Sequence, residues 1–77
     1  MGVDWDEIPD WVQWVARNKD GASYGYFHEP RASRDKTYWV NSVLFSAVLY
    51  LPSWVVNDSE PNFAKWERPK TVGGNKK

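Results

Sequence analysis

The four residues Asn18-Lys19-Asp20-Gly21 constrain the fold more than any other stretch of this chain. They separate two runs, 11–17 and 23–28, that are rich in aromatic residues and, in the first run, valine. Such residues favour β-strands. A type I turn on 18–21, with Gly21 at positive φ, is a common way to close a three-residue hairpin loop. The sequence therefore predicts a β-hairpin, and the turn fixes its register.

The predicted register divides the side chains of the hairpin between two faces. One face is strongly aromatic, and we expect it to belong to the core together with Trp39. The other face is mixed in composition, and we expect it to stay partly exposed. The pairs on the aromatic face are Ala16 with Tyr24, Trp14 with Tyr26 and Val12 with His28; those on the mixed face are Arg17 with Ser23, Val15 with Gly25 and Gln13 with Phe27.

The remaining segments predict further strands and two short helical pieces. Residues 29–36 are rich in charge and contain Pro30, so we expect a polar loop. Residues 37–51 favour one or two more strands, ended by Pro52. Ser59, Glu60 and Pro61 suit the start of a helix over 62–66, and the acidic N-terminal segment suits a single helical turn. The predicted fold class is α+β: a small antiparallel sheet of three to four strands with a short N-terminal helical turn and a short C-terminal helix. Residues 1–70 form one small domain, and 71–77 a disordered basic tail.

The chain has more large rings than its core needs. Six tryptophans, four tyrosines and three phenylalanines occur in 77 residues. Each large ring can bury roughly 150 to 250 Å², so a domain of this size leaves some of them at the surface. Tryptophan, tyrosine and arginine dominate protein-binding hot spots. We therefore predict a binding protein whose candidate contact residues are Trp11, Phe27, Trp54 and Trp66.

Composition argues against catalysis, metal binding and a cofactor. The chain has no cysteine, and its single histidine, His28, is followed by Glu29, which would point to the opposite face of a strand. The acidic residues of the first ten positions lack the glycine and the bidentate glutamate of a calcium loop. The sequence shows no phosphate-binding or nucleophile motif. We expect a protein that is not an enzyme.

Two alternatives to protein binding remain open. Aromatic rings on a sheet can stack single-stranded nucleic acid, with Arg17, Arg31, Arg34 and Lys36 as phosphate contacts, although a formal net charge of zero disfavours this. A single membrane span is the second alternative, because residues 37–57 carry no charge over twenty-one positions. Pro52 and the many β-branched and aromatic residues in this run favour strands instead.

The spacing of the aromatic residues is similar to that of a known group of proteins. The pattern consists of Trp5, Pro9, Trp11, Trp14 and Ala16, then Asp20-Gly21, Tyr24, Tyr26, Pro30 and Trp39. It resembles small tryptophan-rich proteins encoded by tailed phages and prophages, and it covers the chain to about residue 39 but not 42–57. These often close with a short charged helix and an Arg-Pro, which 63–69 matches. The group has no agreed function. The resemblance implies a phage-encoded accessory protein of the host cytoplasm, which binds a host or phage protein or itself.

Overall fold

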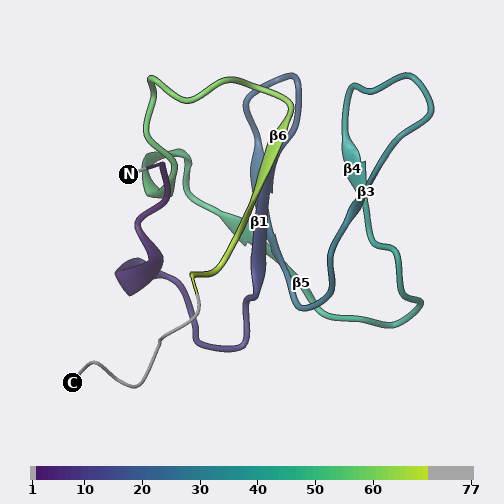
Figure 1. Ribbon diagram of the computed structural model, residues 1–77, viewed down its shortest axis with the longest axis horizontal. Coiled ribbons are helices and arrows are strands. Elements are labelled where there is room, and N and C mark those ends of the chain that lie inside the picture. Colours follow the sequence, from purple (N-terminus) through teal and green to yellow (C-terminus); the bar gives the residue numbers. More distant parts are fainter. Residues whose placement is uncertain (1, 70–77) are drawn as a thin grey trace.

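The chain folds into two antiparallel sheets, seen in a computed structural model that describes residues 2–69. The four-stranded sheet has the order β5-β2-β1-β6, and the other sheet pairs β3 with β4. Figure 1 shows the larger sheet between two helical turns on one side and the β3–β4 hairpin on the other. The elements are η1 (Trp5–Glu7), β1 (Trp14–Arg17), β2 (Ser23–Tyr26), β3 (Arg31–Ala32), β4 (Trp39–Val40), β5 (Val48–Leu51), η2 (Ser53–Val55) and β6 (Ala64–Glu67).

The register predicted for the first hairpin is confirmed. Strands β1 and β2 pair Trp14 with Tyr26 and Ala16 with Tyr24. The loop closes through the Gly21 N–H, which donates to the Asn18 carbonyl at 2.9 Å, and Gly21 has a φ of 94°. That conformation is open to glycine without a Cβ penalty. The ladder ends at Trp14, so the two pairs expected further out, Gln13 with Phe27 and Val12 with His28, do not form.

The α+β prediction is wrong, because the expected C-terminal helix is a strand. Residues Ala64–Glu67 form β6 along the free edge of β1, and Trp66 pairs with Val15. Within residues 2–69 the only helical elements are η1 and η2, each three residues long. A helix confined between Pro61 and Pro69 would be too short to offset the cost of nucleation. The edge of β1 instead supplies hydrogen-bond partners all along the segment.

The main core lies on the mixed face of the hairpin, and not on the aromatic face as expected. Val15 is fully buried there, and Val12 leaves the strand alternation to pack over Gly25. Gly25 has no side chain, and this absence makes the room that Val12 occupies. The two helical turns and the N-terminal segment close the core from outside. Its buried members are Val3, Ile8, Val12, Val15, Leu51, Val55 and Val56, with Trp5, Leu49 and Trp66 packed against them.

The aromatic face forms a second layer beneath the β3–β4 hairpin. Tyr26 is buried there, whereas Trp14 and Trp39 are half-buried. The Trp39 ring stacks on Phe63 with a centroid distance of 4.8 Å, and its Nε1–H donates to the Arg17 carbonyl at 3.1 Å. The Trp39 indole thereby helps to fasten the β3–β4 hairpin to the larger sheet, together with main-chain hydrogen bonds from Lys19 to Thr37 and from Trp39 to the Asn18 side chain. The segment 29–36, expected to be only a loop, contains β3 because Arg31 pairs with Val40.

Burial of Tyr26 gives a prediction about alkaline pH. Loss of hydration, and secondarily the neighbouring Tyr24, raises the pKa of the Tyr26 phenol above its ordinary value. Because the pKa is raised, the neutral Tyr26 phenol stabilises the fold, fully so below the pKa that this phenol has in the unfolded chain. The contribution is lost as pH rises through the pKa of the phenol in the folded state. We expect Tyr26→Phe to remove an ionisation step that lies above the ordinary pKa of a phenol in an ultraviolet titration. Loss of a step at the ordinary phenol pKa instead would contradict the assignment.

The uncharged run 37–57 is divided among β4, β5, η2 and the loops between them. In the described part of the chain no helix has both the length and the apolar character needed to cross a membrane. The predicted basic tail, 71–77, lies outside the described residues.

Candidate protein-binding surface

A turn at residues 43–46 carries bare apolar side chains. Phe45 is 100% exposed and Leu44 is 85% exposed. The turn is closed by the Ser46 N–H, which donates to the Val43 carbonyl at 3.2 Å, and Phe45 has a φ of 63°. The Asn41 side-chain amide donates to the Ser46 carbonyl at 2.8 Å. Polar contacts therefore hold the turn in place while its apolar side chains face solvent.

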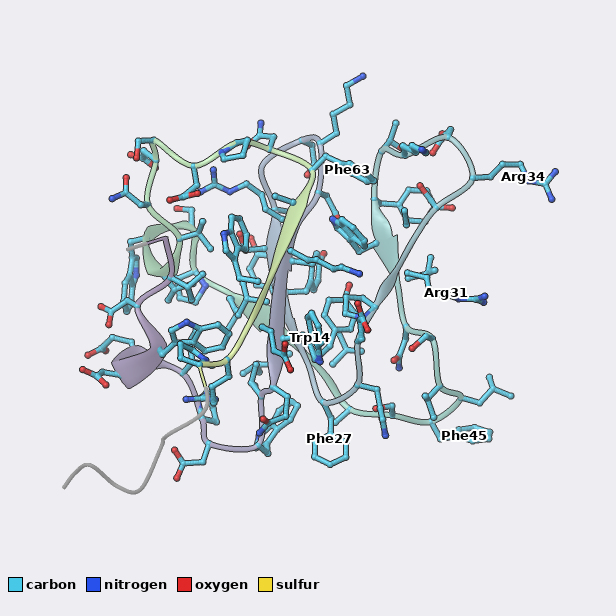
Figure 2. All side chains as sticks on the ribbon, viewed as in Figure 1. Trp14, Phe27, Arg31, Arg34, Phe45 and Phe63 are labelled. Carbon is cyan, nitrogen blue, oxygen red and sulfur yellow. The ribbon has the colours of Figure 1, made fainter. Side chains whose placement is uncertain are left out.

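Two of the rings singled out in the sequence lie beside this turn. Trp11 and Phe27 line a surface hollow together with residues of the 43–47 segment. Trp11 is 37% exposed and Phe27 is 47% exposed. The Phe27 N–H donates to the Ala47 carbonyl at 3.3 Å, which fastens the end of β2 to this segment. Figure 2 shows Phe27 and Phe45 projecting outward from the same end of the molecule. We name this surface the apolar rim: Trp11, Phe27, Val43, Leu44 and Phe45.

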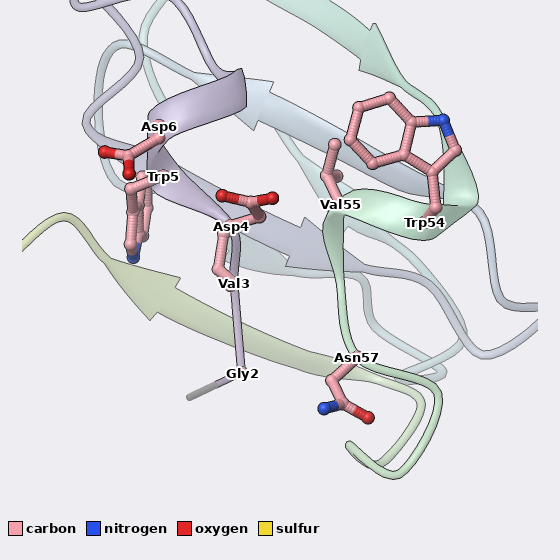
Figure 3. A pocket seen from close by; sticks show the side chains of 8 residues that line it. All are labelled: Gly2, Val3, Asp4, Trp5, Asp6, Trp54, Val55 and Asn57. Atoms are coloured by element: carbon pink, nitrogen blue, oxygen red, sulfur yellow. The ribbon is translucent and has the colours of Figure 1, made fainter.

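The other two candidate rings are placed elsewhere. Trp54 is 61% exposed and lies in η2. It lines a hollow between η1 and η2, where Asp4 and Asp6 contribute carboxylates (Figure 3). Trp66 packs against the main core and is half-buried. The structure thus gathers Trp11 and Phe27 at the rim, separates Trp54 from them, and uses Trp66 for packing.

Sequence reasoning missed the most exposed residues of the rim, Leu44 and Phe45. The run 43–51 has the composition of a strand, and a strand would bury about every second side chain. Only Val48–Leu51 is a strand, and the residues before it form a loop. Asn41, Ser42 and Ser46, which interrupt the apolar residues, were the available sign of a turn.

The four basic residues considered for nucleic acid are not brought together. Arg17 is 5% exposed, and its guanidinium donates to the carbonyls of Glu60 at 3.0 Å and Val56 at 3.2 Å. Arg31, Arg34 and Lys36 are exposed on the β3–β4 hairpin. Arg31 and Arg34 point away from the aromatic face into solvent (Figure 2). Of the four, Arg31 lines a surface hollow that Trp39 and Lys65 also line.

A cation close to the aromatic layer, Lys65, is bound by its own neighbours. Lys65 Nζ lies 2.6 Å from the Glu29 carboxylate, and 5.2 Å from the centre of the Trp39 ring. It also lies 5.6 Å from the Trp14 ring. Lys65 therefore joins β6 to the loop before β3, and these contacts account for its position.

Two titratable groups of the described chain, His28 and Asp35, serve local structure. His28 Nδ1 shares a hydrogen bond with the Ser46 hydroxyl at 2.7 Å. Hydrogen bonds from Thr37 and Ser33 lower the pKa of the Asp35 carboxyl, which organises the turn between β3 and β4. Between residues 2 and 69, no three histidine or acidic side chains gather as metal ligands would.

The described residues thus place the apolar rim beside several polar groups that hydrogen-bond to their own neighbours. The rim combines rings from two loops with a solvent-facing turn. Comparisons of the chain with protein-family models, with curated proteins and with solved structures gave no match.

Proposed function

We propose that this protein is a non-catalytic binding module that recognises another protein through the apolar rim. The observation that carries the proposal is the complete exposure of the Phe45 ring beside an 85% exposed Leu44. Soluble monomeric proteins rarely leave contiguous apolar patches of this kind in water, and such patches commonly mark interaction sites. Trp11 and Phe27 extend the patch with two more rings.

The character of the rim favours an uncharged contact surface on the partner. No charged residue occurs between positions 37 and 57, which include the solvent-facing turn. Binding to the rim is therefore driven by apolar burial, and salt should affect it little. Stacking of nucleic acid is not supported, because Arg17 is committed to main-chain carbonyls and the exposed arginines lie on another hairpin.

The biological setting belongs to the same proposal. The resemblance of the spaced aromatic residues to phage and prophage proteins supports a phage-encoded accessory protein acting in the host cytoplasm. Its partner is a host protein, a phage protein or a further copy of the chain. The protein acts stoichiometrically, by binding to a surface of its partner, and does not catalyse a reaction.

A photo-crosslinking experiment tests the rim. A benzophenone side chain is placed at position 45 and, as a matched control, at position 38, where Tyr38 is 48% exposed on the β3–β4 hairpin. We expect position 45 alone to form an adduct with a protein in the producing cell. The identified partner, once purified, should bind the unmodified chain with little change on raising salt. Phe45→Ser should weaken this binding at least about tenfold, and Tyr38→Ser should not.

Adducts mainly with nucleic acid, or equal adducts from positions 38 and 45, would contradict the proposal. So would a purified partner whose affinity is unchanged by Phe45→Ser.

A further inference from the structure

We infer that the chain forms a two-fold dimer in which β5 pairs antiparallel with β5 of a second copy, joining the two larger sheets edge to edge. The inference names the partner of the apolar rim and so rests on the proposed function, but its main evidence is the backbone of β5. That strand lies at an edge of the larger sheet.

The outward main-chain groups of β5 are available for pairing. The Phe27 N–H donates to the Ala47 carbonyl, and the alternation of an antiparallel ladder then directs Leu49 and Leu51 toward β2 as well. The N–H and carbonyl groups of Val48 and Tyr50 therefore point away from the sheet. In the described part of the chain, nothing hydrogen-bonds to them.

The two edges of the sheet differ in a way that selects β5. At the β6 edge, the outward positions are Lys65 and Glu67, since Trp66 and Ala64 face β1. Charged residues on an edge strand oppose pairing with another chain. The β5 edge has the sequence Val-Leu-Tyr-Leu and carries no charge. One edge is protected and the other is left suited to strand addition.

A two-fold axis at Leu49 satisfies the free groups of β5. It places Val48 of one copy opposite Tyr50 of the other, and each such pair exchanges both of its main-chain hydrogen bonds. Val48 is 44% exposed and Tyr50 is 66% exposed, so their side chains become cross-strand neighbours at low cost. The two Leu49 side chains meet on the core side of the joined sheets.

The same axis covers the exposed residues that flank β5. In an antiparallel pair, the turn before one strand lies beside the segment after the other. Leu44 and Phe45 of one copy are thus directed toward Trp54 of its partner. Phe45, Tyr50 and Trp54 are 100%, 66% and 61% exposed. At roughly 150 to 250 Å² for a fully buried ring, their exposed parts supply about half of the ~800 Å² per partner of a standard interface.

Charge favours a second copy as the occupant of this edge. The segment 37–57 contains no charged residue, and the formal net charge of the chain is zero. Two copies therefore meet without like-charge repulsion, and an acidic or basic partner would find no opposite charge along β5.

A charge-exchange experiment tests the pairing. The double variants Val48→Lys with Tyr50→Lys, and Val48→Glu with Tyr50→Glu, place like charges opposite one another across the axis. We expect the unchanged chain to sediment as a dimer, each double variant alone as a monomer, and an equimolar mixture of the two as a heterodimer. Tyr38→Lys, a control on the other hairpin at a residue that is 48% exposed, should remain dimeric. Dimeric double variants, or a mixture that stays monomeric while both variants keep their fold by circular dichroism, would overturn the inference.

Amide hydrogen exchange on the unchanged chain gives a second test that needs no variant. Exchange at Val48 and Tyr50 should slow at least about tenfold as protein concentration rises through the dissociation constant. The Leu49 and Leu51 amides, bonded within each copy, should change little. A chain that is monomeric at every concentration, or a dimer with unchanged exchange at Val48 and Tyr50, would exclude β5 pairing. The proposed function would still stand if position 45 crosslinks to a different protein, and would fail separately if position 45 crosslinks to none.

Discussion

Replacing Arg17 by methionine should lower the free energy of unfolding by about 3 kcal/mol. Arg17 lies at the end of β1 and is 5% exposed. Its guanidinium donates to the main-chain carbonyls of Val56, Asn57 and Glu60, at 3.0 to 3.4 Å. It thereby ties β1 to the loop that follows η2. Methionine keeps the apolar stem of the side chain but leaves these carbonyls without their donor.

The size of the effect depends on which of two opposing terms is larger. Burying a cation without a carboxylate partner is costly, and methionine removes that cost. The lost hydrogen bonds are charge-assisted, however, and the Val56 carbonyl is buried, so we expect their loss to dominate. Urea unfolding followed by tryptophan fluorescence should show a lower midpoint, and the melting temperature should fall by about 15 °C.

Arg34→Met is the matched control for this experiment, because Arg34 is exposed on the β3–β4 hairpin. It should change the unfolding free energy by less than about 0.5 kcal/mol. Equal stability of the two variants would show that the Arg17 contacts contribute nothing net to the fold.

Replacing Gly25 by alanine should destabilise the protein by about 2 kcal/mol. A Cβ at this position would lie 2.8 Å from Val12 Cγ1 and 3.2 Å from Val12 Cγ2. Val12 is fully buried, so it has little room to move away. In an open strand the same substitution would be favourable, since alanine loses less backbone entropy than glycine. A lower melting temperature for Gly25→Ala would therefore show that close packing requires glycine here. A higher melting temperature would show that the site has room for a Cβ.

Shortening Val12 should rescue the Gly25 variant. Val12→Ala alone creates a small cavity, with a cost of about 1 to 2 kcal/mol. Combined with Gly25→Ala, it removes the clash, so the double variant should be more stable than the sum of the single effects by about 1 kcal/mol or more. Additive effects would place the cause of the Gly25 destabilisation somewhere other than Val12.

The first hairpin was predictable because its information is local. Asp20-Gly21 demands one turn geometry, and that turn sets the partner of every residue from Trp14 to Arg17. The choice of which face of the hairpin packs into the core does not depend on local sequence. The Val15 face has few large residues of its own, and its core is completed by Val55, Val56 and the N-terminal segment, all distant in sequence.

The C-terminal segment and residues 43–47 were mispredicted for related reasons. Residues 62–66 have a reasonable helix start, but the vacant edge of β1 outweighs a weak preference over five positions. Composition placed residues 43–47 in a strand, whereas the hydrogen bonds of Asn41 and Ser46 form a turn there. The surplus of rings named Trp11 and Phe27 as candidates, and only the folded chain shows that they line one hollow with Phe45.

The left-handed backbone of Phe45 has a consequence for laboratory evolution. Its φ of 63° suits glycine or asparagine far better than phenylalanine. Its ring is fully exposed in the single chain, so it gains no stability from burial. A library selected only for thermal resistance or yield should therefore discard phenylalanine at this position early. A library selected for partner capture should keep it. At position 45, selection for stability and selection for partner binding would therefore favour different residues.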